Sequence, residues 1–471
     1  MPPLVAAASV APPETPAVGG TVSLHADVAV VGAGPVGCAA ALAMARRGAR
    51  VILLEGNPDG TAHRLSGELL HPSGVQMLQA LGADPTPLAR DYPNGEGFTF
   101  FPGAGSRPVT LSYDRGARGL SCDHSELVGF LRQAAAAHGR IDYLPGTRGL
   151  RLGGGRLLCR RGDESFEVHA RRLIAATGRS SFLARRRGAL RGERPARLLS
   201  AMAGLTLEDV ELPEEGFGHI FLGGPGPLLL YRIGQGRARL CCDFPPAAWK
   251  ARHDHHAFLW ESYNGALPSP LRASFAAALR RDHLMCSANY YVPRTHYGWD
   301  EVVLVGDATG QAHPLTATGI TLGLGDVACL LEARSLPQYR RRRLATTFVP
   351  EIVATGLYKV MTGTDPLSGG LRQAIFQVWR RGPESRDRTM RLLALEDTHL
   401  VRFCRLYLEL MITGAAVSLR RSASRSASGV RWPGRLLALA AALPAWLLAP
   451  AAVAWRRRGI LWRQPWKRAR A

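Results

Sequence analysis

Residues 27–37 read Asp-Val-Ala-Val-Val-Gly-Ala-Gly-Pro-Val-Gly, and this stretch decides the fold. The apolar run at 27–31 predicts a short buried strand, which leads through three glycines into an Ala-rich helix that extends to about Arg47. A second strand is expected at 51–54 and is followed by Glu55. These segments form a complete βαβ opening, so the sequence predicts an α/β fold that begins with a Rossmann-like domain.

Each glycine of this turn has a separate physical purpose. Gly32 permits a tight strand-to-helix turn, Gly34 lets the backbone approach a pyrophosphate, and Gly37 allows close packing of the helix. Glu55 lies eighteen positions after Gly37, where it is expected to accept hydrogen bonds from a ribose. The pattern favours dinucleotide binding over a purely structural turn. The predicted contacts in this part of the chain are Gly32, Gly34, Pro35, Val36, Gly37, Glu55 and Gly56.

A second, remote motif distinguishes flavin adenine dinucleotide (FAD) from a nicotinamide. Gly306-Asp307 follows another apolar strand, more than 250 residues after the first glycine motif. A long extended cofactor needs such a second set of contacts. Asp307 is expected to hydrogen-bond the ribityl or pyrophosphate region, and a helix that starts near Gly319 is expected to point its amides at the flavin ring. The two motifs together predict FAD as the cofactor.

The pattern of apolar runs and turns divides the chain into five predicted parts. Between about 198 and 244 short β-like runs replace the strand-helix alternation, which predicts an inserted sheet for the substrate. Beyond about Tyr339 the chain is predicted to be helical and increasingly basic. The predicted boundaries are a flexible leader at 1–25, the FAD-binding domain at 26–190 and 296–345, the substrate-domain sheet at 191–295, and a helical, membrane-associated region at 346–471.

Charge and hydropathy at the C-terminus predict a membrane surface as a partner. The chain has a formal net charge of +22, and the segment 410–471 contributes twelve Arg or Lys and no carboxylate. Within it, 436–455 is an uncharged run with Arg and Trp at its edges, which suits a bilayer interface and which nucleic acid would not require. Because Pro444 and Pro450 interrupt this run, we expect a broken hairpin in one leaflet rather than a span. A bland helix with a solvated basic tail is the alternative.

The remaining composition indicates a folded body in water. Apolar residues make up 46% and charged residues 20% of the chain, which is unlike a disordered or multi-span protein. The eight cysteines have no metal-ligand or redox spacing, so we predict buried reduced thiols and no metal site. The N-terminal segment lacks the features of a secretory signal. We therefore expect a membrane-associated protein whose catalytic body faces the cytoplasm.

Several motifs carry a resemblance to one family. Gly306-Asp307-Ala308 precedes His313-Pro314-Leu315-Thr316, and then Gly319, Thr321 and Asp326 follow. Residues 64–75 read Arg-Leu-Ser-Gly-Glu-Leu-Leu-His-Pro-Ser-Gly-Val. The first set resembles the signature of squalene epoxidases, and 67–74 is similar to that family's Gly-Glu-Leu-Leu-Gln-Pro-Gly-Gly segment. Residues 225–243 and 364–365 resemble the family as well, so the resemblance covers most of the chain after about Asp27.

The resemblance implies an FAD-dependent monooxygenase that delivers one oxygen atom from dioxygen to an alkene of a long isoprenoid, as in the epoxidation of squalene. It further implies a lipophilic isoprenoid-like substrate, and NADPH as an indirect electron donor through a separate flavin reductase. By the same resemblance, Arg64, Glu55, Thr147, Asp307 and Ile320 fall at flavin-contacting positions. Tyr113 falls at the family's active-site tyrosine, and the alternative for this residue is a packed tyrosine without a catalytic role.

Three departures from the family pattern concern the flavin and substrate region. Glu126 stands in the segment 124–132, where the family carries an arginine, and Thr177 replaces an acidic residue. Ala317 and Thr318 replace two of three glycines. These departures leave the substrate open, so the alternatives are a flavin-dependent hydroxylase of a prenylated or alkyl aromatic compound, an isoprenoid double-bond reductase, and a non-catalytic membrane flavoprotein.

Overall fold

The computed structural model describes most of the chain after residue 21. The described residues are 22–57, 65, 67–103, 105–114, 116–153, 156–180, 196–299 and 302–426, with 444, 446–448, 450, 451, 453 and 454 near the C-terminus. The predicted flavin contact Arg64 lies outside the described residues, and so does most of the predicted interfacial run.

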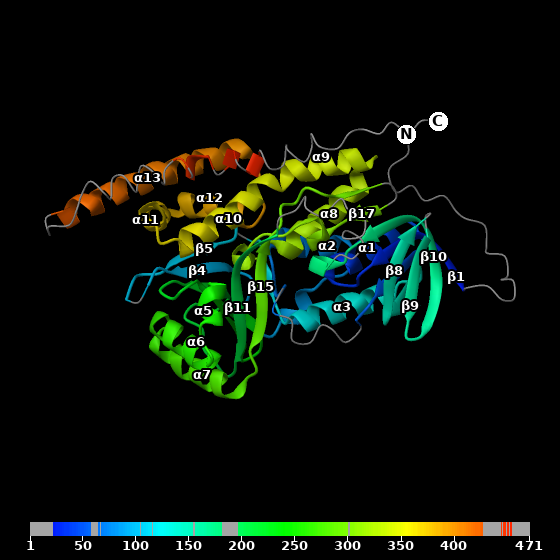
Figure 1. Ribbon diagram of the computed structural model, residues 1–471, viewed down its shortest axis with the longest axis horizontal. Helices are drawn as coiled ribbons and strands as arrows, with labels where there is room; N and C mark the ends of the chain where they lie inside the picture. Colours follow the sequence, from blue (N-terminus) through cyan, green and yellow to red (C-terminus); the bar gives the residue numbers. More distant parts are fainter. Residues whose placement is uncertain are drawn as a thin grey trace.

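The first sheet is the parallel core that the glycine motif predicts (Figure 1). Its strands are β1 (Ser23–Val31), β2 (Val51–Glu55), β7 (Ile141–Pro145), β8 (Thr147–Gly153), β9 (Arg156–Arg161), β10 (Glu164–Ala175), β16 (Gly298–Trp299) and β17 (Val302–Leu304). β17, β10, β1, β2 and β7 lie side by side in parallel, and β8 and β9 extend β10 as an antiparallel meander.

Successive side chains of β1 point to opposite faces of this sheet, and each face packs against a different layer. Val28 and Val30 face a core that includes four helices, whereas Ala29 and Val31 face the meander of β8, β9 and β10. The four helices are α1 (Pro35–Ala45), α2 (Pro72–Ala80), α3 (His124–Ala136) and α8 (Gly319–Glu332). The parallel strands are therefore covered on both faces, as in most α/β folds.

The start of β1 differs from the predicted boundary. The strand begins at Ser23 and pairs with β10 from Ser23↔Glu167 onward, so residues 23–25, which the sequence analysis placed in the leader, belong to the sheet. His25 stacks on His169 of β10, with ring centroids 4.8 Å apart. The polar residues in this half of the strand obscured the strand pattern, because they lie at the exposed end of the sheet.

The second sheet lies beside the first and has seven strands in the order β15-β11-β14-β13-β12-β4-β5 (Figure 1). These are β4 (Gly97–Phe101), β5 (Val109–Ser112), β11 (Arg197–Leu207), β12 (Phe217–Phe221), β13 (Leu228–Gly234), β14 (Arg237–Phe244) and β15 (Met285–Tyr291). Two short strands, β3 (Leu69–Leu70) and β6 (Leu120–Ser121), pair nearby. β4 and β5 come from the segment that the sequence analysis assigned to the FAD-binding domain, and β4 joins the sheet by parallel pairing with β12.

Helices cover both faces of the second sheet. One face packs against α5 (Pro246–Lys250), α6 (His255–Tyr263) and α7 (Ser269–Arg281), and the other packs against the C-terminal helices. The C-terminal helices on this face are α10 (Phe348–Thr362), α11 (Pro366–Arg380), α12 (Pro383–Leu393) and α13 (Leu400–Ser426). Helix α9 (Leu336–Thr346) packs instead against the first sheet, where the Tyr339 hydroxyl donates to the carbonyl oxygen of Leu304. In Figure 1, α9 and α13 form one long edge of the molecule, with α10, α11 and α12 beneath α13.

All eight cysteines are free, and five are buried as predicted, but Cys286 and Cys404 are exposed and Cys329 is half-buried.

Among the helices that the structure describes, none is both long enough and apolar enough to span a bilayer.

Candidate active site

The first glycine loop has the geometry that its sequence predicts. Gly32 has a φ of +102°, which favours glycine, and a Cβ at Gly37 would overlap the carbonyl oxygen of Gly32. By contrast, a Cβ built on Gly34 would have no heavy atom within 4 Å among the described residues. The loop is therefore tightly packed beneath and open above Gly34, which leaves room for a phosphate group over its backbone.

The loop around Asp307 packs directly against this first loop, although the two are remote in sequence. A Cβ added to Gly306 would lie 3.4 Å from the side chain of Val36, and a Cβ added to Gly323 would overlap Val36 and lie 3.1 Å from the Cα of Gly306. Val36 thus fits between the two glycines. A larger residue at either glycine position would prevent α1 and α8 from approaching this closely. The structure brings Gly34, Pro35, Val36 and the Asp307 turn to one place.

Glu55 is held in a defined orientation at the base of the glycine loop. Its carboxylate accepts the Ala33 N–H at Oε2 and the Asn57 N–H at Oε1, each at 2.8 Å. Arg132 pairs with Glu55 at 3.1 Å and donates from Nε to the carbonyl oxygen of Ala33 at 2.9 Å. The side chain of Glu55 keeps a partly exposed edge, as a ribose-binding carboxylate needs.

Arg132 is a site residue that sequence reasoning missed. The segment 124–132 was expected to lack the family arginine because Glu126 stands in it, and Glu126 instead forms an exposed ion pair with Arg237. Arg132 lies at the end of the same segment on α3, one face of which packs against α1. Helical spacing from the buried Leu127, Val128 and Leu131 could have identified this position, since the next turn also faces the glycine loop.

Two buried hydroxyl groups fit a bound dinucleotide. Thr147, at the start of β8, is buried beside Gly56, and its Oγ1 has no hydrogen-bond partner among the described residues. The Oγ1 of Thr177, which follows β10, is also buried and has no hydrogen-bond partner among the described residues. A buried hydroxyl without a partner costs free energy unless a ligand supplies one. These atoms and the open space above Gly34 indicate that the residues present suit FAD.

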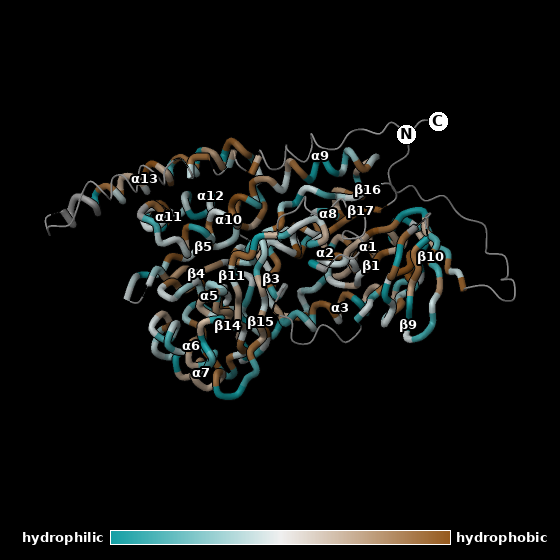
Figure 2. The backbone as a smooth tube through the Cα atoms, viewed as in Figure 1, coloured by the Kyte–Doolittle hydropathy of each residue, from teal (hydrophilic) through white to brown (hydrophobic). Residues whose placement is uncertain are grey.

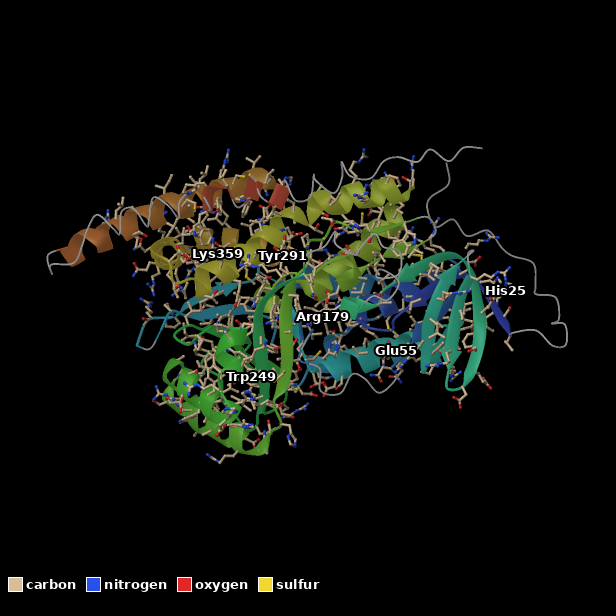
Figure 3. All side chains as sticks on the ribbon, in the orientation of Figure 1. His25, Glu55, Arg179, Trp249, Tyr291 and Lys359 are labelled. Carbon is tan, nitrogen blue, oxygen red and sulfur yellow. The ribbon has the colours of Figure 1, made fainter. Side chains whose placement is uncertain are left out.

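Asp307 lies on the open side of the site, and Figure 3 shows its neighbour Arg179 between the two sheets. The side chain of Asp307 is 35% exposed, and its Oδ2 is 3.9 Å from Nε of Arg179. Arg179 also donates from Nη1 to Ser287 Oγ at 3.1 Å, which ties it to β15 of the second sheet. Asp307 is therefore accessible to a ligand, and a guanidinium group lies beside it.

The N-terminus of α8 is not capped by a side chain of the described residues. Its N-cap residue, Thr318, makes no side-chain capping bond within the described part of the chain, and a Cβ at Gly319 would meet nothing within 4 Å. Ile320 is half-buried and lies against Gly67, whose added Cβ would be 3.0 Å from its Cδ1. Unpaired amides and the positive end of a helix dipole suit an electron-rich ring.

His71 connects Tyr113 to the turn that precedes α8. His71 Nε2 is 2.8 Å from the carbonyl oxygen of Thr316, which can only accept, so Nε2 carries the proton. Burial lowers the pKa of His71 to about 4, so the ring is neutral and its Nδ1 accepts the Tyr113 O–H at 2.9 Å. Tyr113 is thus connected to the turn before α8, and burial raises the pKa of its hydroxyl.

The buried state of His71 predicts a pH dependence of stability. The folded pKa of about 4 lies below the ordinary value of 6.5, so the unfolded chain binds the extra proton between these values. The free energy of unfolding should therefore fall as the pH is lowered from about 6.5 to 4, and His71→Gln should remove part of that slope. Urea unfolding at several pH values measures it. An unchanged slope in the variant would contradict a neutral buried His71.

An apolar cavity lies among the C-terminal helices. Its volume is about 110 Å³, and almost all of its lining is apolar. Residues of α10, α11, α12 and α13 line it, including Gly356, Ile375, Trp379 and Met411. Trp446 closes one side, where its backbone oxygen accepts a hydrogen bond from Tyr407 and its ring lies 4.0 Å from Nζ of Lys359. An apolar cavity among packed helices is a common setting for a small-molecule site.

Comparisons with known proteins agree with this geometry. The family model described as squalene epoxidase matches residues 181–424, and the model described as FAD dependent oxidoreductase matches residues 27–190. A squalene epoxidase of Schizosaccharomyces pombe is 26% identical over 80% of this chain and 88% of its own length. A squalene epoxidase of Aspergillus fumigatus is 28% identical over 76% of this chain and 80% of its own.

Among solved structures, the flavin-dependent brominase Bmp2 matches 82% of this chain and 99% of its own, with a TM-score of 0.64 and 17% identity. That likeness shows the fold alone. The squalene epoxidase model covers more than half of the chain, and the FAD model covers most of the rest. The chain therefore belongs to the squalene epoxidase family and is an FAD-dependent monooxygenase.

Proposed function

We propose that this chain epoxidises squalene to 2,3-oxidosqualene, with the hydrocarbon held in the apolar cavity of the C-terminal helices. The observation that carries the proposal is the position of this cavity, which shares one hydrophobic core with Tyr113 and with the turn that precedes α8. A substrate of hydrocarbon alone offers no group for hydrogen bonding. A cavity with almost no polar lining suits such a substrate, because burial of apolar surface is then the main source of affinity.

Packed aromatic side chains on β4 connect the cavity to Tyr113. Phe98 and Phe100 are two positions apart, so both point to the same face of the strand. Phe100 contacts Trp379 at the cavity with ring centroids 4.7 Å apart, and Phe98 contacts Tyr113 with centroids 6.4 Å apart. An extended alkene chain along this row of aromatic side chains would bring one end to Tyr113.

The proposed roles follow from these positions. When bound, FAD supplies the chemistry that activates dioxygen. Val36 and the glycines around it hold the two loops together, and Thr147, Glu55 and Asp307 are proposed to contact the dinucleotide. Tyr113, with its hydrogen donated to His71, is proposed to line the reacting end of the cavity. The apolar walls exclude water, which protects the oxygenation from side reactions.

The outer surface of α13 supports association with a membrane, and we propose that the substrate comes from this membrane. Val401, Leu408, Ile412 and Leu419 form a stripe on this helix and are 65%, 52%, 71% and 46% exposed. Leu447 and Leu448 lie beside Trp446 and are also exposed. Figure 2 shows hydrophobic positions along this outer edge. Contiguous exposed apolar side chains next to a basic segment fit a bilayer surface, with the catalytic body proposed to face the cytoplasm.

We further propose that electrons reach FAD from NADPH through a separate flavin reductase. The sequence has only one dinucleotide fingerprint, at Gly32 to Gly37, and the Thr147 and Glu55 side of that loop is already proposed for FAD. A second nucleotide would need its own phosphate-binding turn. Catalysis with NADPH should therefore depend on an added reductase.

The test uses the full chain in detergent with squalene, dioxygen, NADPH and a flavin reductase. Formation of 2,3-oxidosqualene with one labelled oxygen atom from ¹⁸O₂ supports the proposal. Turnover of a prenylated aromatic compound instead of squalene would discard the substrate and keep the monooxygenase. Saturation of a lipid double bond without oxygen uptake would overturn the proposed reaction.

Filling the cavity should impair lipid turnover without loss of flavin. Gly356 lines the cavity, and a Cβ at this position would meet nothing within 4 Å among the described residues. Gly356→Phe is therefore expected to occupy the space without a clash and to raise the KM for squalene about fivefold, with FAD content unchanged. Gly356→Ala serves as the control and should retain the wild-type KM. An unaltered KM in the Phe variant would place the substrate elsewhere.

A further inference from the structure

A buried carboxylate in the second sheet contacts the turn that leads into α8. Asp243, on β14, is fully buried, and its Oδ2 accepts from Ser200 Oγ at 2.6 Å, Asn289 Nδ2 at 3.1 Å and His313 Nε2 at 3.1 Å. Ser200 and Asn289 come from the adjacent strands β11 and β15. Three neighbouring strands of the second sheet therefore converge on one histidine of the turn.

His313 transmits this contact to the backbone of the turn. Its Nδ1 accepts the Leu315 N–H at 3.2 Å, so the proton of the ring is on Nε2, where it points at Ser200 and Asp243. Its ring also stacks on Tyr358 of α10, with centroids 3.7 Å apart. The side chain is fully buried. His313 consequently has one orientation, set on one edge by the backbone and on the other by the carboxylate.

The turn that His313 starts contains a strained residue. Ala317 has φ of +52°, a left-handed conformation that costs an ordinary residue free energy and that glycine adopts freely. The Ala317 N–H bonds to the carbonyl oxygen of Pro314, which closes the turn immediately before Gly319. Such a conformation persists only where its surroundings fix it. His313 on one side and the His71 bond to the Thr316 carbonyl on the other supply these constraints.

We propose that Asp243 is a positioning residue for the flavin: it fixes His313, and His313 keeps the strained turn in the shape that presents the N-terminus of α8 to the ring. The inference rests on the proposed placement of FAD at this helix. Asp243 is fully buried, so in this proposal it acts through His313 and not by contact with the cofactor. It links the sheet that underlies the proposed substrate cavity to the loop that is proposed to face FAD. One buried group therefore fixes the position of the two sites relative to each other.

The experiment measures the dissociation constant of FAD by titration of the apoprotein and the absorbance spectrum of the bound flavin. Asp243→Asn keeps an acceptor oxygen but removes the charge, which weakens the bonds to His313 and Ser200. We expect a three- to tenfold rise in the dissociation constant and a shifted flavin spectrum. Ser200→Ala removes one donor while the carboxylate keeps His313, so it should raise the constant about twofold and remains informative if the Asn variant folds poorly.

A second substitution separates positioning from simple loss of stability. In Asp243→Asn/Ala317→Gly the turn is no longer strained, so the double variant should recover FAD affinity to within about twofold of the wild type. His219→Gln is the matched control, because His219 is equally buried in the same sheet and, within the described part of the chain, its ring is hydrogen-bonded to the backbone of Leu230 and Glu214. It should leave FAD affinity unchanged.

Two results would overturn the inference: wild-type affinity and spectrum in Asp243→Asn, or a double variant that binds FAD as weakly as the single one. Failure of the wild-type protein itself to bind FAD would instead refute the flavin site, which distinguishes the two proposals.

Discussion

Replacement of Asp326 by Ala is expected to lower the free energy of unfolding by about 3–5 kcal/mol. Asp326 is fully buried on α8, and its carboxylate pairs with Arg294 at 2.5 Å and with Arg343 at 2.7 Å. Both guanidinium groups are buried too, so removal of the carboxylate leaves two positive charges without their anion in the interior. Urea denaturation followed by tryptophan fluorescence measures the loss.

The same carboxylate also accepts the Gly306 N–H at 2.8 Å, which links protein stability to the Asp307 turn. FAD affinity should therefore fall together with stability in Asp326→Ala. Asp326→Asn retains an acceptor for Gly306 and should lose less of both. Glu332→Ala, at the exposed end of the same helix, is the control and should change the unfolding free energy by less than about 0.5 kcal/mol. Equal unfolding free energies of Asp326→Ala and Glu332→Ala would contradict a structural role for Asp326.

Gly323→Ala is expected to raise the dissociation constant of FAD about 30- to 100-fold, equivalent to about 2–3 kcal/mol. The added methyl group would overlap Val36 and crowd the Cα of Gly306, so α1 and α8 would have to move apart. That movement separates the two loops that are proposed to bind the same dinucleotide. Titration of the apoprotein with FAD, followed by flavin fluorescence, gives the constant for each variant.

A double-variant cycle makes this prediction specific. Val36→Ala alone removes two methyl groups from the contact and should weaken FAD binding only slightly. In Val36→Ala/Gly323→Ala the overlap with the side chain is gone, so much of the lost affinity should return. Gly129→Ala controls for the general effect of Ala in a helix, because Gly129 is on the exposed face of α3 and its added Cβ would lie more than 4 Å from every neighbouring heavy atom that the structure describes. Additive effects at Val36 and Gly323 would show that the two residues do not meet.

The part of the fold that the sequence predicts best is the local part. The turn from β1 to α1 follows from its own glycines, and the strand at Val302–Leu304 and the helix at Gly319 follow from apolar runs next to Gly306 and Gly319. These features depend on neighbours in sequence, so hydrophobic periodicity and glycine placement contain enough information. Family resemblance then connected the two loops.

Long-range pairing and buried polar contacts could not be predicted in the same way. β4 joins β12 in parallel across more than a hundred residues, and no turn signal in the sequence marks such a pair. Arg132 and Asp243 acquire their contacts only when separate elements pack together. Helical spacing favours Arg132 over Glu126 for the packed face of α3, but only tertiary packing determines that this face meets α1 and the glycine loop.

The Gly32–Gly37 loop and the Asp307 turn are proposed to bind one FAD molecule at the end of an apolar cavity. The most direct measurement is an experimentally determined structure of the full chain saturated with FAD. We expect the pyrophosphate over Gly34, the ribityl chain beside Asp307 and the ring at the N-terminus of α8, on the side of Tyr113 and the cavity. Density for FAD that contacts only one of the two loops, or a ring that points away from Tyr113, would contradict it.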